Sequence, residues 1–142
     1  MAIYYFEEAV QSRLKNKRRL NAFLKKKIEE YRPVKKVNLN FIFCDDAFLL
    51  EKNINFLNHD TYTDIITFDL SESSDVLDAE IYISIERVAE NATNMKIPYQ
   101  EELHRVIFHG VLHLCGFKDK TEKEQSIMRM KEQECLQQYT EI

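Results

Sequence analysis

Hydrophobic and polar positions alternate with two different periods along this chain of 142 residues. From Val37 to Phe43, every second residue is apolar, which is typical of a strand with one buried face. Similar runs predict further strands at 3–6, 65–70 and 80–85. Elsewhere apolar residues recur every three or four positions, which predicts helices at 13–31, 45–58, 86–95, 98–115 and 121–139.

The ends of these segments carry the residues that start and stop helices. Pro33 ends the first helix, and the fourth is opened by Pro98 and stopped by Gly116. Thr121 and Glu124 have the spacing of a capping box for the last helix. Without an internal repeat or a linker, the pattern predicts one α+β domain over residues 1–142.

Composition narrows the class of protein. Hydrophobic residues make up 44% of the chain and charged residues 31%, with two Gly and two Pro, which indicates a globular fold. No apolar run approaches the roughly 18 residues of a membrane span, so we expect no membrane partner. The three cysteines are odd in number and far apart, which argues against a disulfide scaffold and favours a reducing, cytoplasmic location.

Charge is strongly segregated although the formal net charge is only −4. Residues 13–36 contain eleven Lys or Arg and two Glu, a net charge of +9. Residues 40–80 contain ten acidic residues and one Lys, a net charge of −9. The basic segment is either a solvated helix face or a surface that attracts a polyanion.

Two histidines carry the candidate chemistry. His109 and His113 are four residues apart in a predicted helix, so both imidazoles lie on one face. Such pairs often only pack or face solvent, but Gly116 allows a sharp turn that brings Asp119 back towards them. Two imidazoles and a carboxylate suit Zn²⁺ and leave a fourth position for water. Gly110 occupies the position where an H-E-x-x-H metallopeptidase has its general base, which disfavours peptide hydrolysis.

The stretch HGVLHLCGF, from His109 to Phe117, resembles the H-G-x-L-H-L-x-G-[YF] signature of the YbeY family of metal-dependent rRNA-maturation endoribonucleases. Leu57-Asn58, Thr63–Phe68 and Glu80–Ser84 resemble further family segments in the same order. The resemblance implies an α+β, zincin-like fold with a small, mostly parallel four-stranded sheet packed by helices. It also implies one zinc ion on the core helix and single-stranded RNA, chiefly rRNA precursor, as substrate.

Two departures from the family pattern concern the site. Asp119 stands where the family has a third histidine, and it makes the ion less electrophilic and relaxes selectivity towards harder ions such as Mn²⁺. The family's Arg after L-N is missing from LNHDTYTD, so Lys118 or Lys120 is a candidate substitute for holding phosphate.

The remaining candidates have competing interpretations. Asp64 and Glu80 either orient a ligand histidine through its second nitrogen or bond locally. With Lys118, they are the candidates for a catalytic role. His59 is expected in an exposed loop and His104 in a structural or exposed position. Candidate RNA contacts on the basic segment are Arg18, Arg19, Lys25 and Lys26.

Together these features predict a zinc-dependent, single-strand-specific endoribonuclease of rRNA maturation and ribosome quality control, with the ribosome as a partner. His109, His113 and Asp119 are the predicted metal ligands. One alternative is a ribosome- or RNA-associated factor with a structural metal and little catalysis. The other is a zinc hydrolase of another substrate.

Overall fold

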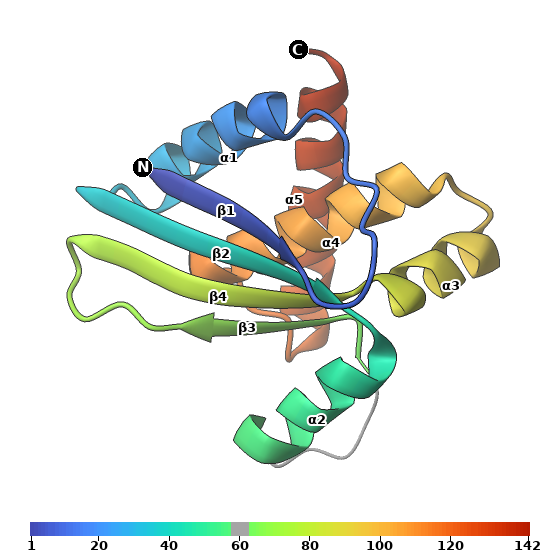
Figure 1. Ribbon diagram of the computed structural model, residues 1–142. Coiled ribbons are helices and arrows are strands. Elements are labelled where there is room, and N and C mark those ends of the chain that lie inside the picture. The colour runs from blue at the N-terminus through green and yellow to red at the C-terminus, as the bar shows by residue number, and fades with distance from the viewer. Residues whose placement is uncertain (58–62) are drawn as a thin grey trace.

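The computed structural model describes residues 1–57 and 63–142, which form four strands and five helices (Figure 1). The strands are β1 (Ala2–Glu7), β2 (Lys36–Cys44), β3 (Ile65–Asp69) and β4 (Val76–Ser84). The helices are α1 (Lys17–Tyr31), α2 (Asp46–Leu57), α3 (Ile85–Met95), α4 (Tyr99–Leu114) and α5 (Glu122–Thr140).

The strands form one sheet in the order β1-β2-β4-β3, in which only β3 runs antiparallel to its neighbour. The expected α+β fold with a small, mostly parallel sheet is therefore confirmed. Figure 1 shows α1, α4 and α5 on one face of this sheet. None of the helices in the described part of the chain is long and apolar enough to cross a membrane.

The core lies between the sheet and these three helices. Alternate residues of β2 and β4 point into it, and Leu39, Phe41, Ile81 and Ile83 are fully buried. This alternation confirms the two-residue period that predicted the strands. The residues between the buried ones point to the other face of the sheet and are half-buried.

Gly110 brings α4 close to the sheet at the level of the two histidines. A Cβ atom at this position would lie 2.8 Å from Ile65 Cδ1 and 3.3 Å from Ile81 Cγ2. These atoms come from β3 and β4, so the absence of a side chain permits the approach. Glycine in mid-helix therefore has a packing reason here, in spite of its poor helix propensity.

Two predicted elements, the first helix and the last strand, differ from the structure by more than one residue at a boundary. α1 begins at Lys17 rather than at residue 13, because Arg13 and Asn16 adopt left-handed backbone conformations with φ of 58° and 57°. β4 begins at Val76, and Ile85 belongs to α3 rather than to the strand. The Ser84 side chain accepts a hydrogen bond from the Arg87 backbone N–H and so caps that helix.

The turn between α4 and α5 contains both predicted signals, the glycine that ends one helix and the capping box that begins the next. Gly116 has a φ of +103°, a conformation that side chains disfavour, and it follows directly after the last residues of α4. Both hydrogen bonds of the capping box between Thr121 and Glu124 are present. The chain thus reverses between these two signals and carries Asp119 back towards α4.

Candidate metal site

His109 lies between two carboxylates that come from different parts of the chain. Its Nδ1 is 2.6 Å from Glu132 Oε2, which projects from α5. Its Nε2 is 3.4 Å from Asp119 Oδ2, in the turn after Gly116. The imidazole is thus held on one side and faces a potential ligand on the other.

His113 lies one helical turn further along α4 and near its end. Its ring centroid is 6.2 Å from that of His109, and the two rings are inclined at 83°. The side chain of His113 is exposed, whereas that of His109 is only 18% exposed. The predicted placement of both histidines beside one another on the same helix is therefore observed.

These donors fit zinc in kind, and two of them fit it in spacing. Two ligands of one tetrahedral zinc, with bonds of about 2.0–2.1 Å, lie roughly 3.3 Å apart. The 3.4 Å between His109 Nε2 and Asp119 Oδ2 agrees with that separation. Imidazole nitrogen and carboxylate oxygen are both ordinary zinc ligands.

The zincin-like metal centre implied by the resemblance stays a prediction. Across residues 1–57 and 63–142, no three His, Cys, Asp or Glu side chains converge closely enough to share one ion. His113 is the predicted ligand outside the His109–Asp119 pair, and its side chain is exposed.

Glu132 belongs to a buried charge network behind His109. Its Oε1 accepts a hydrogen bond of 3.0 Å from Arg105 Nη1. Arg105 also donates two hydrogen bonds of 2.7 Å to Glu102, whose side chain is fully buried. A buried carboxylate of this kind is stable only when paired, so Arg105 holds both glutamates in place.

The network and the neighbouring acids shift the pKa values of the residues that they contact. Burial alone would raise the pKa of Glu132, but hydrogen bonds from His109 and Arg105 outweigh it and lower the value. Burial alone would lower the pKa of His109, but Glu132, Asp119 and Asp64 together raise it. The bidentate hydrogen bonds to Glu102 raise the pKa of Arg105, so its positive charge is permanent.

The histidine-orienting residue was missed in the sequence, where Asp64 and Glu80 were the candidates. Asp64 lies 3.6 Å from Arg105 Nη2 and influences His109 only through its charge. Glu80 accepts a hydrogen bond from the Tyr82 hydroxyl and lies on the sheet face away from α4, so it does not orient a histidine.

A sequence signal for Glu132 nevertheless exists. The buried residues of α5 are Met128, Glu132, Cys135 and Tyr139, which follow the helical spacing of a buried face. A carboxylate in that register must have a buried partner. Glu102 gives the same signal, since it lies among the buried residues of α4.

The candidate cationic residues lie in two places. Lys118 and Lys120 flank Asp119 and are exposed. Arg18 and Lys26 are exposed on α1, where Lys25 is half-buried. Arg19 donates hydrogen bonds to the backbone carbonyls of Tyr139 and Ile142, so its guanidinium is committed to the end of the chain.

Other predicted residues fall outside this site. His104 lies between Phe108 and Tyr139, with ring centroids 6.1 and 4.9 Å away, in the predicted structural role. Burial raises the pKa of the Cys115 thiol to about 11, which disfavours a thiolate ligand. His59 and the rest of residues 58–62, within the LNHDTYTD segment, lie outside the described residues.

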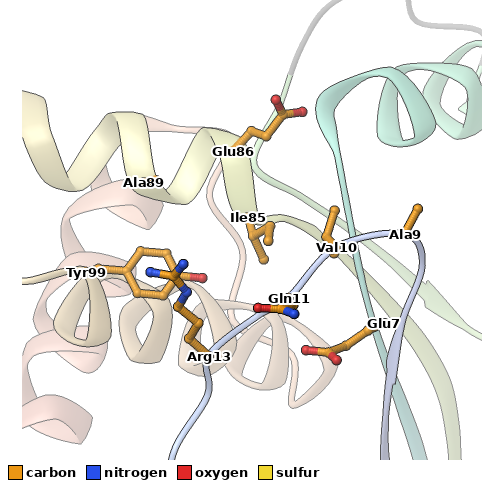
Figure 2. A pocket seen from close by; sticks show the side chains of 9 residues that line it. All are labelled: Glu7, Ala9, Val10, Gln11, Arg13, Ile85, Glu86, Ala89 and Tyr99. Carbon is orange, nitrogen blue, oxygen red and sulfur yellow. The ribbon is translucent and has the colours of Figure 1, made fainter.

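A cavity of about 1090 Å³ opens at the end of β1, away from these donors. Its lining includes Gln11, Arg13, Ile85 and Tyr99, whose side chains are labelled in Figure 2. His109, His113 and Asp119 are not among its lining residues. The cavity is therefore separate from the candidate metal site.

Comparison with known proteins assigns a family to this arrangement. The family model described as Endoribonuclease YbeY matches residues 5–140. A protein named Endoribonuclease YbeY from Amoebophilus asiaticus is 48% identical over 130 residues, which are 92% of this chain and 88% of the relative. One of the same name from Flavobacterium psychrophilum is 57% identical over 98 residues, 69% of each chain.

A solved structure has the same fold. The solution structure of TM1509 from Thermotoga maritima superimposes with a TM-score of 0.60 at 29% sequence identity. The superposition covers 96% of this chain and 88% of that protein.

Proposed function

Because this chain belongs to the YbeY family of endoribonucleases, we propose that it cleaves single-stranded RNA with one zinc ion held by His109, His113 and Asp119. The observation that carries the proposal is the 3.4 Å spacing of His109 Nε2 and Asp119 Oδ2, which suits two ligands of one ion. The exposed His113, one turn away, supplies the third donor by a side-chain rotation.

Each residue around the ion has a separate task. Bound zinc would supply Lewis acidity towards a phosphoryl oxygen and an acidified water. Glu132 holds His109 through Nδ1 and leaves Nε2 directed at Asp119. Lys118 and Lys120 attract the phosphate as point charges, in place of a bidentate arginine. Asp119 makes the site more negative than three histidines would, which favours Mn²⁺ as an alternative to zinc.

The basic helix α1 provides sequence-independent attraction for the RNA backbone. Arg18, Lys25 and Lys26 are the proposed contacts, while Arg19 contributes its charge, because its Nη2 donates to the carbonyls of Tyr139 and Ile142. Tyr31, at the end of α1, packs edge-to-face against Phe117, with ring centroids 5.1 Å apart. The basic helix therefore ends beside the turn that carries Asp119.

The proposed biological role is maturation of rRNA precursors and ribosome quality control, with the ribosome as partner. This role rests on the family to which the chain belongs. A reducing, cytoplasmic location is proposed because Cys44, Cys115 and Cys135 are all free thiols.

Metal content tests the ligand set directly. Purified protein incubated with zinc and then desalted should retain about one equivalent, as expected for a three-ligand site. His113→Ala and Asp119→Asn should each reduce this content severalfold. Asp75→Asn, the same change in the turn before β4, is the matched control and should leave it unchanged. A protein that stays metal-free after zinc exposure would refute the assignment.

Cleavage then distinguishes the three candidate functions. We expect the zinc-loaded protein to cut a labelled single-stranded RNA, and chelation or Asp119→Asn to abolish cutting. RNA binding that falls steeply with salt, without any cleavage, would indicate a binding factor with a structural metal. Metal-dependent hydrolysis of another ester, with no effect on RNA, would indicate a different hydrolase.

A further inference from the structure

The buried face of α5 contributes a glutamate to the site, although the predicted ligand set contains no residue of that helix. Glu132 Oε2 lies 2.6 Å from His109 Nδ1, and the carboxylate side chain is only 5% exposed. The short distance, the burial and the second contact to Arg105 together restrict this side chain to one orientation.

From this contact we infer that Glu132 is a positioning residue, which holds His109 as its Nδ1–H tautomer and so leaves Nε2 free to bind a metal. The inference deepens the proposed function and rests on it for the identity of the bound ion. An ionised carboxylate can only accept hydrogen bonds, so the shared proton must be carried by Nδ1. In neutral imidazole the other nitrogen is then an unprotonated donor of electrons to a metal.

Arg105 determines which oxygen of Glu132 is left to face His109. Its guanidinium has only donors, and it occupies Oε1 of Glu132 while its other N–H groups bind both oxygens of Glu102. Whatever group stands at position 132 must therefore present an acceptor to Arg105. A carboxylate meets this requirement and still offers a second acceptor to His109.

An amide at the same position would not meet both requirements. With Glu132→Gln, the amide oxygen must turn to Arg105, because an NH₂ group there would face another donor. The amide NH₂ then faces His109 Nδ1, which must become an acceptor. The substitution thus favours the opposite tautomer, with the proton on Nε2, where it competes with the metal.

The charge around His109 points in the same direction. Glu102, Glu132 and Asp64 all lie within 3.6 Å of the Arg105 guanidinium, and Asp119 lies 3.4 Å from His109 Nε2. The three carboxylates that contact Arg105 thus outnumber its single positive charge. A divalent cation on the Asp119 side of the imidazole would compensate much of this excess.

The test is nitrogen NMR of the metal-free protein, with the pH raised until the spectrum shows a neutral His109 ring. Wild-type His109 should show the Nδ1–H tautomer, and Glu132→Gln should show mainly the Nε2–H tautomer. Glu134→Gln is the matched control, since Glu134 lies on the same helix, pairs with Lys131 and has a side chain 44% exposed. It should leave the His109 spectrum unchanged.

Zinc affinity, measured by competition with a chromophoric chelator, is the second readout. Glu132→Gln should weaken binding about 10- to 100-fold, the usual effect of removing a partner that orients a metal ligand. Glu132→Asp keeps two negative acceptor oxygens and should weaken binding less than Glu132→Gln. Circular dichroism of each variant shows whether the fold persists.

Two results would overturn the inference. One is an Nε2–H tautomer of His109 in the wild-type protein. This measurement does not depend on whether any variant folds. The other is a folded Glu132→Gln variant with unchanged tautomer and unchanged zinc affinity. A wild-type protein with the expected tautomer that binds no zinc would instead refute the proposed function and leave the tautomer assignment standing.

Discussion

The close approach of α4 to the sheet at Gly110 can be tested by adding one methyl group. In Gly110→Ala, the new Cβ would lie 2.8 Å from Ile65 Cδ1, 3.3 Å from Ile81 Cγ2 and 3.4 Å from Thr67 Cγ2. The first distance is shorter than real Cβ atoms show, the second is tighter than ordinary van der Waals contact, and the third is ordinary contact. The first contact is with Ile65 Cδ1, the end of a flexible side chain. Ile81 Cγ2 and Thr67 Cγ2 are instead bonded directly to the branched Cβ atoms of their residues.

The magnitude follows from two opposing effects. Alanine in a helix interior is about 1 kcal/mol more favourable than glycine. Overpacking a core costs about 1–3 kcal/mol. We therefore expect Gly110→Ala to lower the free energy of unfolding by roughly 1 kcal/mol, even though the substitution improves helix propensity.

Removal of the clashing atom should reverse the sign. Ile65→Val deletes Cδ1 and costs about 0.5–1.5 kcal/mol by itself. In that background Gly110→Ala should be neutral or stabilising, so the two substitutions should couple favourably by roughly 1–2 kcal/mol. Such coupling is expected only for residues in direct contact.

Urea unfolding of the four proteins, followed by circular dichroism, measures this coupling. With an m-value of roughly 1–3 kcal/mol/M, a change of 1 kcal/mol shifts the midpoint by about 0.3–1 M. Gly116→Ala serves as a second Gly-to-Ala change, at a position where nothing lies within 4 Å of the new Cβ. Its effect should be the same with and without Ile65→Val. If Gly110→Ala and Ile65→Val are additive within about 0.5 kcal/mol, the packing argument is wrong.

Three further predictions concern single sites. Gly116→Ala should destabilise the protein by about 1–2 kcal/mol in urea unfolding, because φ of +103° strains any side chain; an unchanged midpoint would contradict this. Zinc at about 100 times its dissociation constant should stabilise the wild-type protein by about 2.7 kcal/mol, as measured by thermal unfolding. The same zinc concentration should stabilise His113→Ala much less. Equal stabilisation of both proteins would exclude His113 as a ligand. Burial, assisted by Arg19, lowers the pKa of His104 below its ordinary 6.5, so the unfolded chain binds this proton more readily and stability should fall as pH drops below roughly 6.5. His104→Phe should flatten that part of the stability profile, and an unchanged pH dependence would show that other groups cause it.

Local patterns in the sequence determined most of the secondary structure. The two-residue alternation at Val37–Phe43 predicted β2 within one residue at each end. The capping box at Thr121 and the glycine at 116 marked the turn that returns Asp119. The four-residue spacing of His109 and His113 placed both on α4. Such features depend on neighbours within a few residues, and the sequence displays those neighbours directly.

Tertiary structure alone decided which groups meet across elements. Glu132 lies 23 residues after His109, and no periodicity links the two positions. The pairing arises because α4 and α5 pack together with both side chains on their facing surfaces. Likewise, Asp119 reaches within 3.4 Å of Nε2 only through the path of the turn.

Packing also overruled a local preference in the segment before α1. Residues 13–16 continue the basic, helix-compatible pattern, yet Arg13 and Asn16 are left-handed. There the chain is held by distant contacts, since the Tyr99 hydroxyl donates to the Ser12 carbonyl and the Gln100 side chain donates to that of Arg13. Hydrogen bonds and burial between segments far apart in the chain offset a weak intrinsic propensity, and their partners are defined only once the fold has formed.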